Sequence, residues 1–379
     1  MTVYRRALST GTLSVTPQAD NTYALDALFD IAERRNPKRS FLFVSKVLGR
    51  HIPVAPDTMR AAYRDLADQI PADIPQPALF VGMAETAVGL AAGVHQEARK
   101  RLNDTVLLTS TRHPVDGELL CEFKETHSHA TDHLIYWPEK PHHADLVKHA
   151  RTLVLIDDEA TTGNTFHHLT SALAEAGLNE FERIITVTLT DWSNNSLAQR
   201  QDAAIPTASV SAIALAFGEW DWQVTPNAPV PVMPEVNVTA RGSVDITGQQ
   251  DWGRLGVQDS RCELGSHIQA HAGEKILVLG TSEFIWLPFL LAERLQNDGA
   301  EVLFSTTTRS PISIGHAIQS ALTFTDNYGL GIPNFSYNLS QLQVDRILVC
   351  CETPADAIDP ALIEQLTLIA PNVEIVSYD

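Results

Sequence analysis

The sequence predicts an α/β protein in which a parallel sheet flanked by helices is followed by a second α/β domain. Two observations favour this class. Short apolar runs of the kind that form buried parallel strands alternate with stretches of helical periodicity. In addition, a segment with prolines at 226, 229, 231 and 234 divides the chain, and the pattern before it recurs after it.

Composition narrows the classes of function. The 379-residue chain is long for one hydrophobic core, and its 44% of hydrophobic residues is typical of a globular protein. A net charge of −19 at pH 7 would repel a nucleic-acid backbone, so we expect no nucleic-acid partner. The sequence has no apolar signal core and no membrane-spanning run, and its cysteines lack disulfide or metal spacing. These features favour a cytoplasmic protein without a membrane partner.

The first elements follow from hydrophobic periodicity. We expect a helix at 23–34, a strand at 41–44, a helix at 56–69 and a buried strand at 78–81. A helix then runs to about residue 99, and a further strand is expected at 106–110. The turn between the strand at 78–81 and its helix consists of Gly82, Met83, Ala84, Glu85 and Thr86. Such a junction presents backbone amides at a helix N-terminus, where an anion is favoured.

The run from residue 153 to 165, LVLIDDEATTGNT, carries the clearest chemical signal in the chain. It predicts a buried strand that stops at Asp157 and Asp158, then a Thr-Thr-Gly turn, then a helix that reaches residue 176. The glycine and the helix N-terminus favour a bound phosphate, and paired carboxylates can accept hydrogen bonds from a sugar diol. The alternative is an acidic strand end that only caps the helix. A Walker phosphate loop is excluded because Gly-Lys-Ser/Thr is absent.

This run resembles the signature of the type I phosphoribosyltransferases, whose substrate is 5-phosphoribosyl-1-pyrophosphate (PRPP). The resemblance implies a phosphoribosyltransferase-like parallel sheet, and it places the ribose hydroxyls on Asp157 and Asp158. The 5′-phosphate would lie on the residues that follow. The implied PRPP-binding set is Asp157, Asp158, Glu159, Ala160, Thr161, Thr162, Gly163, Asn164 and Thr165. The same resemblance implies that the backbone amides of Gly82 to Thr86 hold the pyrophosphate.

Residues 111 to 139 are polar, and we expect them to form a long loop. In the family that this chain resembles, such a loop closes over PRPP. Arg112 and Lys124 are then the candidate catalytic residues, which would stabilise the charge that develops on the pyrophosphate. The spacing of His127, His129 and His133 also allows a zinc site, although solvated or acceptor-contacting histidines are favoured and no dedicated metal site is predicted.

Aromatic and basic residues around this frame have two interpretations. The family builds a hood over the base, which Lys46, Arg50 and His51 could join, but ordinary surface positions are favoured. Trp192 follows a strand at 183–190 and could stack on a base, although a place at the edge of the core is favoured. One more strand is expected at 208–217. We place the domains at 1–223 and 241–379, with a proline-rich linker at 224–240.

The second domain has the pattern of a degenerate copy of the first. A strand at 276–279, a Gly-Thr-Ser-Glu turn and a helix repeat the earlier junction, and Thr-Arg-Ser-Pro at 308–311 parallels Thr-Arg-His-Pro at 111–114. Cys350 and Cys351 are expected at the places of Asp157 and Asp158, so this copy should not hold PRPP in the same way. The polar residues left at its strand ends are Glu283, Thr308, Arg309 and Ser310. They predict a second site for the acceptor, the product or a partner, with a purely structural role as the alternative.

The Thr-Arg-Ser-Pro motif adds a second resemblance, to a C-terminal domain that follows a phosphoribosyltransferase domain in bacterial proteins of tellurite-resistance gene clusters. Together the two resemblances imply a Mg²⁺-dependent enzyme that transfers phosphoribose from PRPP to a base-like small molecule and releases pyrophosphate. The product would be a nucleoside-like stress metabolite, and Mg²⁺ would arrive largely with the pyrophosphate. The alternative is a non-catalytic regulator that senses PRPP or a nucleotide. The sequence leaves the acceptor and the oligomeric state open, a homodimer included.

Overall fold

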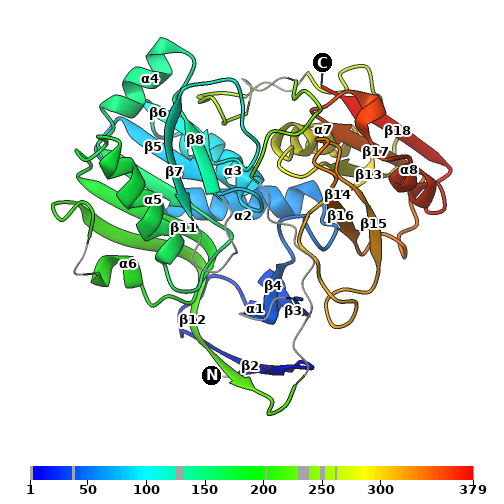
Figure 1. Ribbon diagram of the computed structural model, residues 1–379, viewed down its shortest axis with the longest axis horizontal. Coiled ribbons are helices and arrows are strands. Elements are labelled where there is room, and N and C mark those ends of the chain that lie inside the picture. Colours follow the sequence, from blue (N-terminus) through cyan, green and yellow to red (C-terminus); the bar gives the residue numbers. More distant parts are fainter. Residues whose placement is uncertain are drawn as a thin grey trace.

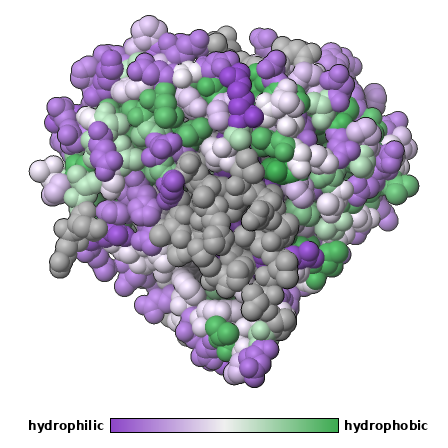
Figure 2. All heavy atoms as spheres, viewed as in Figure 1, coloured by the Kyte–Doolittle hydropathy of each residue, from purple (hydrophilic) through white to green (hydrophobic). Residues whose placement is uncertain are grey.

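The computed structural model describes residues 3–35, 39–124, 132–200, 203–228, 239–247, 252–260 and 263–378. Two α/β halves lie side by side, the first up to residue 228 and the second from residue 239 (Figure 1). Helices α2 (Pro56–Gln69), α3 (Val88–Ala98) and α7 (Trp286–Asn297) pack against one another between the two sheets. Hydrophilic residues predominate around the edge of the face shown in Figure 2, as the acidic composition requires. No helix of the described segments is long and apolar enough to cross a membrane.

The first half is organised on one large sheet. Its parallel part has the order β12-β11-β9-β5-β6, and two antiparallel strands, β2 and β1, extend it beyond β12. The bounds are β1 Tyr4–Ala7, β2 Gly11–Pro17, β5 Ala78–Gly82, β6 Thr105–Thr109, β9 Thr152–Ile156, β10 Glu159–Ala160, β11 Arg183–Asp191 and β12 Ser209–Val224. Every residue of β5, β6 and β9 is buried, which explains why these strands are nearly continuous apolar runs. The remaining helices are α4 Pro141–Lys148, α5 Asn164–Glu175 and α6 Ser196–Gln199.

Two expectations about local structure were wrong. The helix expected at 23–34 is only α1 (Leu25–Leu28), followed by β3 (Phe29–Glu33), which pairs antiparallel with β4 (Phe41–Ser45). The loop expected at 111–139 contains an antiparallel hairpin, β7 (Leu119–Lys124) and β8 (Asp132–Tyr136). In both places pairing with a partner strand overrides weak local propensity.

The second half repeats the order of the first. Its parallel sheet is β14-β13-β17-β18, which corresponds strand by strand to β6-β5-β9-β11. The bounds are β13 Lys275–Gly280, β14 Glu301–Thr306, β15 Ala321–Thr325, β16 Pro333–Tyr337, β17 Arg346–Cys351, α8 Pro360–Leu366 and β18 Asn372–Ser377. Individual hydrogen bonds also recur: Ser110 N donates to Gly82 O at 2.9 Å, and Thr307 N donates to Gly280 O at 2.9 Å. The duplicated frame is therefore present in the backbone.

The strand register corrects the sequence alignment of the two halves by one residue. The last residue of β5 pairs with Ile156, whereas the last residue of β13 pairs with Cys350. Cys350 therefore corresponds to Ile156, and only the first acid has become a cysteine, Cys351. The second half retains a carboxylate, because Glu352 takes the place of Asp158.

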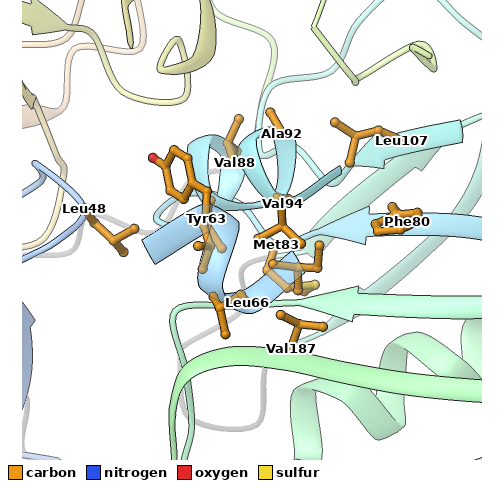
Figure 3. Close-up of a cluster of buried hydrophobic side chains, with 14 of the residues drawn as sticks. Leu48, Tyr63, Leu66, Phe80, Met83, Val88, Ala92, Val94, Leu107 and Val187 are labelled. Atoms are coloured by element: carbon orange, nitrogen blue, oxygen red, sulfur yellow. The ribbon is translucent and has the colours of Figure 1, made fainter. Parts of the chain in front are cut away.

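The two halves share one hydrophobic core. The largest cluster of buried side chains includes residues of β5 and β9 as well as residues of β13, β14 and α7. Tyr63 on α2 lies in this cluster, and a Cβ at Gly93 of α3 would come within 2.1 Å of its ring. Figure 3 shows side chains of α2, α3, the sheet and two loop positions, 48 and 83, converging there: Leu48, Tyr63, Leu66, Phe80, Met83, Val88, Ala92, Val94, Leu107 and Val187. A glycine on α3 thus lets the helices between the halves approach closely.

Candidate functional site

The candidate site lies at the carboxyl edge of the first sheet. Strands β6, β5 and β9 are parallel neighbours, so the segments that follow them emerge side by side. These segments are the turn at residues 82–86, residues 110–113, and the turn at residues 157–163. Ligands of open α/β sheets bind at this edge. The structure therefore brings together three of the segments singled out in the sequence.

The end of the 157–163 turn needs a glycine. Gly163 has φ +70° immediately before α5, a left-handed conformation that L side chains rarely adopt, and a Cβ there would lie 2.4 Å from Ser196 Oγ. Ser196 Oγ donates to Thr162 O at 2.7 Å, and Arg200 Nη1 donates to Asn164 Oδ1 at 2.9 Å. Contacts from α6 and from Arg200 therefore hold the start of α5 in place. The N-terminal amides of α5 lie at the sheet edge.

The acids of this turn have different surroundings. Asp157 and Asp158 are half-buried, and Asp158 N donates to Asp157 Oδ1 at 2.9 Å. Burial raises the pKa of Asp158, while Asp157 and the positive charge of Arg50 act in the opposite direction. Glu159 faces Arg39, with 2.7 Å between Oε1 and Nη2. Burial also raises the pKa of Glu159, against the effect of Arg39. Glu159 thus pairs with Arg39, which lies just before β4, and not with the groups around the two aspartates.

Part of the 82–86 turn is already occupied by protein partners. Met83 N donates to Ile156 O at 3.0 Å, and Ala84 N donates to Ser110 Oγ at 2.9 Å. A backbone amide that donates within the protein does not hold a ligand. The amides of Met83 and Ala84 therefore do not bind an anion, and the expectation of anion binding now concerns the amides of Glu85 and Thr86.

Glu85 projects from this turn toward the second half. Its carboxylate contacts Arg50, accepts a hydrogen bond from Ser282 Oγ at 2.9 Å, and lies 3.4 Å from Arg309 Nε. Burial opposes ionisation, but Arg50, Arg309 and Arg112 together lower the pKa of Glu85 to about 2. A buried carboxylate held in this way fixes the conformation of the turn that carries it.

Arg50 was missed by the sequence reasoning, which favoured a surface position. Arg50 is 3% exposed and His51 is 7% exposed, whereas Lys46 is half-buried and its Nζ donates to Asp26 O at 2.8 Å. Arg50 Nη1 donates to Ser282 O at 3.2 Å, and its charge also acts on Asp158. No local signal marks this burial, because Lys46 lies in the same stretch of sequence and two partners of Arg50, Ser282 and Thr306, belong to the second half.

The two candidate catalytic residues are in different places. Arg112 is half-buried at the site, its Nη2 lies 3.4 Å from His133 Nε2, and Ser110 Oγ lies 3.0 Å from His133 Nδ1. Because Ser110 also accepts from Ala84 N, Arg112 is linked to the 82–86 turn. Lys124 is exposed at the end of β7, beside α5. Arg112 thus lies between the turns, whereas the Lys124 carbonyl oxygen lies 2.9 Å from His168 Nδ1 on α5.

Trp192 occupies the edge of the core, as favoured from the sequence. It is 4% exposed, and its ring stacks on Phe43 with centroids 5.1 Å apart and an interplanar angle of 25°. Phe29 also packs edge-on against it at 5.6 Å. Both neighbours belong to the β3–β4 hairpin, so Trp192 packs this hairpin against the end of β11.

Of the residues expected to form a second site, Glu283, Thr308 and Arg309 are buried between the halves, and Ser310 is half-buried. Glu283 is fully buried, and it accepts hydrogen bonds from Thr111 Oγ1 at 2.6 Å and Arg254 Nη2 at 2.8 Å. Arg254 Nη1 donates to Glu352 Oε2 at 2.9 Å, and Tyr328 OH donates to Glu352 Oε1 at 2.8 Å. Burial opposes ionisation of Glu283, but Arg254 holds its pKa well below the ordinary value. At the sheet edge of the second half, the carboxylates of Glu283 and Glu352 are thus bound by other protein side chains.

No group of three or more histidine, cysteine, aspartate or glutamate side chains in the described ranges could hold a metal ion. His127 and His129 of the alternative zinc site lie outside those ranges, as do three of the four linker prolines, at 229, 231 and 234. His133 is buried and stacks on Phe123 with centroids 4.8 Å apart. Its ring nitrogens face Ser110 and Arg112, so this histidine supports the site through hydrogen bonds.

Two models of known protein families match this chain. A family model described as phosphoribosyl transferase matches residues 28–219, which is half of the chain. A second model, described as the TRSP domain C-terminal to that transferase, matches residues 253–366. The chain belongs to this family of phosphoribosyl transferases with a C-terminal TRSP domain.

One solved structure with detectable similarity is the adenine phosphoribosyl transferase of Trypanosoma brucei, in complex with AMP, pyrophosphate and ribose-5-phosphate. It is 14% identical, with a TM-score of 0.34, over 50% of this chain and 76% of that one. No curated protein matches the sequence.

Proposed function

We propose that the protein is a Mg²⁺-dependent phosphoribosyltransferase that transfers phosphoribose from PRPP to a base-like small molecule and releases pyrophosphate. The observation that carries this proposal is the convergence of the 157–163 turn, the N-terminus of α5 and the 82–86 turn at one sheet edge, in a chain of the phosphoribosyl transferase family. Each of these segments suits a different part of PRPP.

The ribose and its phosphate are assigned to the 157–163 turn. Ionised carboxylates accept hydrogen bonds, so Asp157 and Asp158 suit the 2′- and 3′-hydroxyls. Burial raises the pKa of Asp158, whereas Asp157 and the positive charge of Arg50 act in the opposite direction and so favour the ionised form, which accepts hydrogen bonds. The 5′-phosphate suits the start of α5, where the positive φ of Gly163 ends the turn and the helix begins with its N-terminal amides.

The pyrophosphate is assigned to the 82–86 turn and Arg112. The amides of Glu85 and Thr86 are suited to the phosphate oxygens, and the half-buried Arg112 lies on the neighbouring segment after β6. Negative charge develops on pyrophosphate as the bond between ribose C1 and the leaving oxygen breaks, so a fixed cation there favours the transition state. Mg²⁺ would share that charge when bound, and the carboxylates of Asp157 and Asp158 are oxygen ligands of the type it takes.

Calorimetry with PRPP and Mg²⁺ tests the binding site. Asp157→Asn combined with Asp158→Asn should abolish PRPP binding, because both diol acceptors lose their charge, while the thermal melting temperature stays near that of wild type. The matched control is Asp145→Asn with Asp298→Asn, two exposed acids at other places in the fold. Unchanged affinity in the folded 157/158 variant would remove the basis of the assignment.

Turnover needs a second measurement, since the acceptor is unidentified. Release of pyrophosphate from PRPP in the presence of fractionated small molecules from cell extract would establish transfer. Tight PRPP binding without pyrophosphate release in any fraction would favour the PRPP-sensing alternative.

A further inference from the structure

The two halves contact each other reciprocally through equivalent residues. Glu85 accepts a hydrogen bond from Thr308 Oγ1 of the second half at 3.4 Å, and Glu283 accepts one from Thr111 Oγ1 of the first half at 2.6 Å. Thr111 and Thr308 hold the same place, because each forms an antiparallel bridge with the second strand of its hairpin, β8 or β16. A contact of residue i with j and of j with i defines an isologous interface between two copies. Here both copies belong to one chain.

The second half contributes a buried cation to the 82–86 turn. Arg309 is 7% exposed, its Nε lies 3.4 Å from Glu85 Oε1, and its Nη2 lies 3.2 Å from His113 Nε2. The His113 ring in turn stacks on Tyr328, with centroids 3.9 Å apart and an interplanar angle of 19°. Arg309 is therefore held between Glu85 and His113, and Glu85 belongs to the 82–86 turn of the candidate site.

Other parts of the second half also hold this carboxylate. Ser282 Oγ donates to Glu85 Oε1 at 2.9 Å, and Arg50, which pairs with Glu85, is itself bonded to Ser282 O and Thr306 Oγ1. Without the second half, Glu85 would keep only one of these partners, and a buried carboxylate loses much of its stabilisation when its cations and donors are removed.

We propose that the second half is a built-in second subunit, and that Arg309 and Ser282 are positioning residues that act through Glu85 on the 82–86 turn. The proposal rests on the assignment of this turn to pyrophosphate. The Glu85 side chain and the Glu85 and Thr86 amides share one turn, so holding the side chain fixes the direction of the amides. Arg309 then determines how well the pyrophosphate end of the substrate is bound, without contacting it.

Two probe ligands separate this role from a general structural one. Magnesium pyrophosphate and ribose 5-phosphate are titrated calorimetrically into the full-length chain and into Arg309→Ala. Pyrophosphate affinity should fall by about tenfold or more, the equivalent of one charge-assisted hydrogen bond, while ribose 5-phosphate affinity changes less than about twofold. Arg309→Lys keeps the charge beside Glu85 and should restore part of the affinity. Arg346→Ala is the control, since it removes a guanidinium paired with Glu274 at 3.0 Å in the same half.

A double variant identifies the route. If Arg309 acts through Glu85, then Arg309→Ala combined with Glu85→Ala binds pyrophosphate no more weakly than Glu85→Ala alone. Losses that add would mean that Arg309 contacts the ligand directly, and equal losses for both probes would mean a general role in folding. Either outcome overturns the proposal.

Hydrogen exchange of the unliganded protein tests the positioning independently of the proposed function. The amides of residues 85–88 should exchange faster in Arg309→Ala than in wild type or Arg346→Ala. If wild type binds neither probe but exchange still rises, the positioning stands and the assignment of the turn to pyrophosphate fails. Unchanged exchange overturns the inference whether or not the protein binds pyrophosphate.

Discussion

Glu85 offers a quantitative test of the electrostatics at the interface between the two halves. Its pKa is lowered from 4.5 to about 2, because Arg50, Arg309 and Arg112 outweigh the effect of burial. A carboxylate with a folded-state pKa below its unfolded value stabilises the fold above the unfolded pKa, and this stability is lost as the pH falls toward the folded pKa. The shift corresponds to about 3 kcal/mol at neutral pH, at roughly 1.4 kcal/mol per unit.

The perturbation is Glu85→Gln, which removes the titrating group and keeps the shape of the side chain. Linkage with the two pKa values predicts that between pH 6 and pH 3.5 the wild type loses roughly 1 kcal/mol more stability than the variant. Urea unfolding at a series of pH values measures the difference, with Glu274→Gln as a control that removes a glutamate paired with a single arginine. Equal pH dependence of wild type and Glu85→Gln would refute the reasoning.

Two substitutions test the roles assigned to glycines. Gly163→Ala should weaken PRPP binding at least tenfold and lower the free energy of unfolding by about 1–3 kcal/mol, since φ is +70° and the new Cβ would lie 2.4 Å from Ser196 Oγ. The control is Gly177→Ala, which is also at positive φ but has nothing within 4 Å of the new Cβ. It should lower stability without affecting the affinity for PRPP. Gly93→Ala should destabilise the protein by about 1–3 kcal/mol, because a Cβ would lie 2.1 Å from the Tyr63 ring, and an unchanged urea midpoint would contradict the close packing of α2 on α3.

The parallel strands and the acidic turn could be predicted because their signals are local. Buried strands such as β5 and β9 are continuous apolar runs, and the 157–163 turn carries its glycine, acids and helix start within a few residues. The strand at 29–33 and the hairpin around residues 119–136 could not, since their alternating residues become strands only when a partner is present. For the same reason periodicity could not fix the register of Cys350, which depends on its pairing with β13.

The site residues divide in the same way. Asp157, Asp158, Gly163 and Arg112 lie in segments that the sequence itself identifies, and the structure gathers those segments at one edge. The burial of Arg50 could not be predicted, because the groups that surround it, including Ser282 and Thr306, are more than 200 residues away in the chain. Long-range contacts of this kind are invisible to spacing and periodicity.

The two halves differ in how the carboxylates at their sheet edges are paired. In the first half Arg50 pairs with Glu85, while Asp158 stays half-buried at the sheet edge. In the second half Arg254 bridges the equivalent pair, Glu283 and Glu352, and all three side chains are fully buried.

At the second edge Glu283 and Glu352 already accept hydrogen bonds from protein groups, so neither carboxylate has an acceptor to offer a sugar diol. Glu283 could not simply be lost, since Thr111 Oγ1 and Arg112 N of the first half donate to it at 2.6 and 2.8 Å. Glu283, which the second half retains at its sheet edge, therefore binds the segment after β6 of the first half. Such a contact is expected of a second half that acts as a built-in subunit.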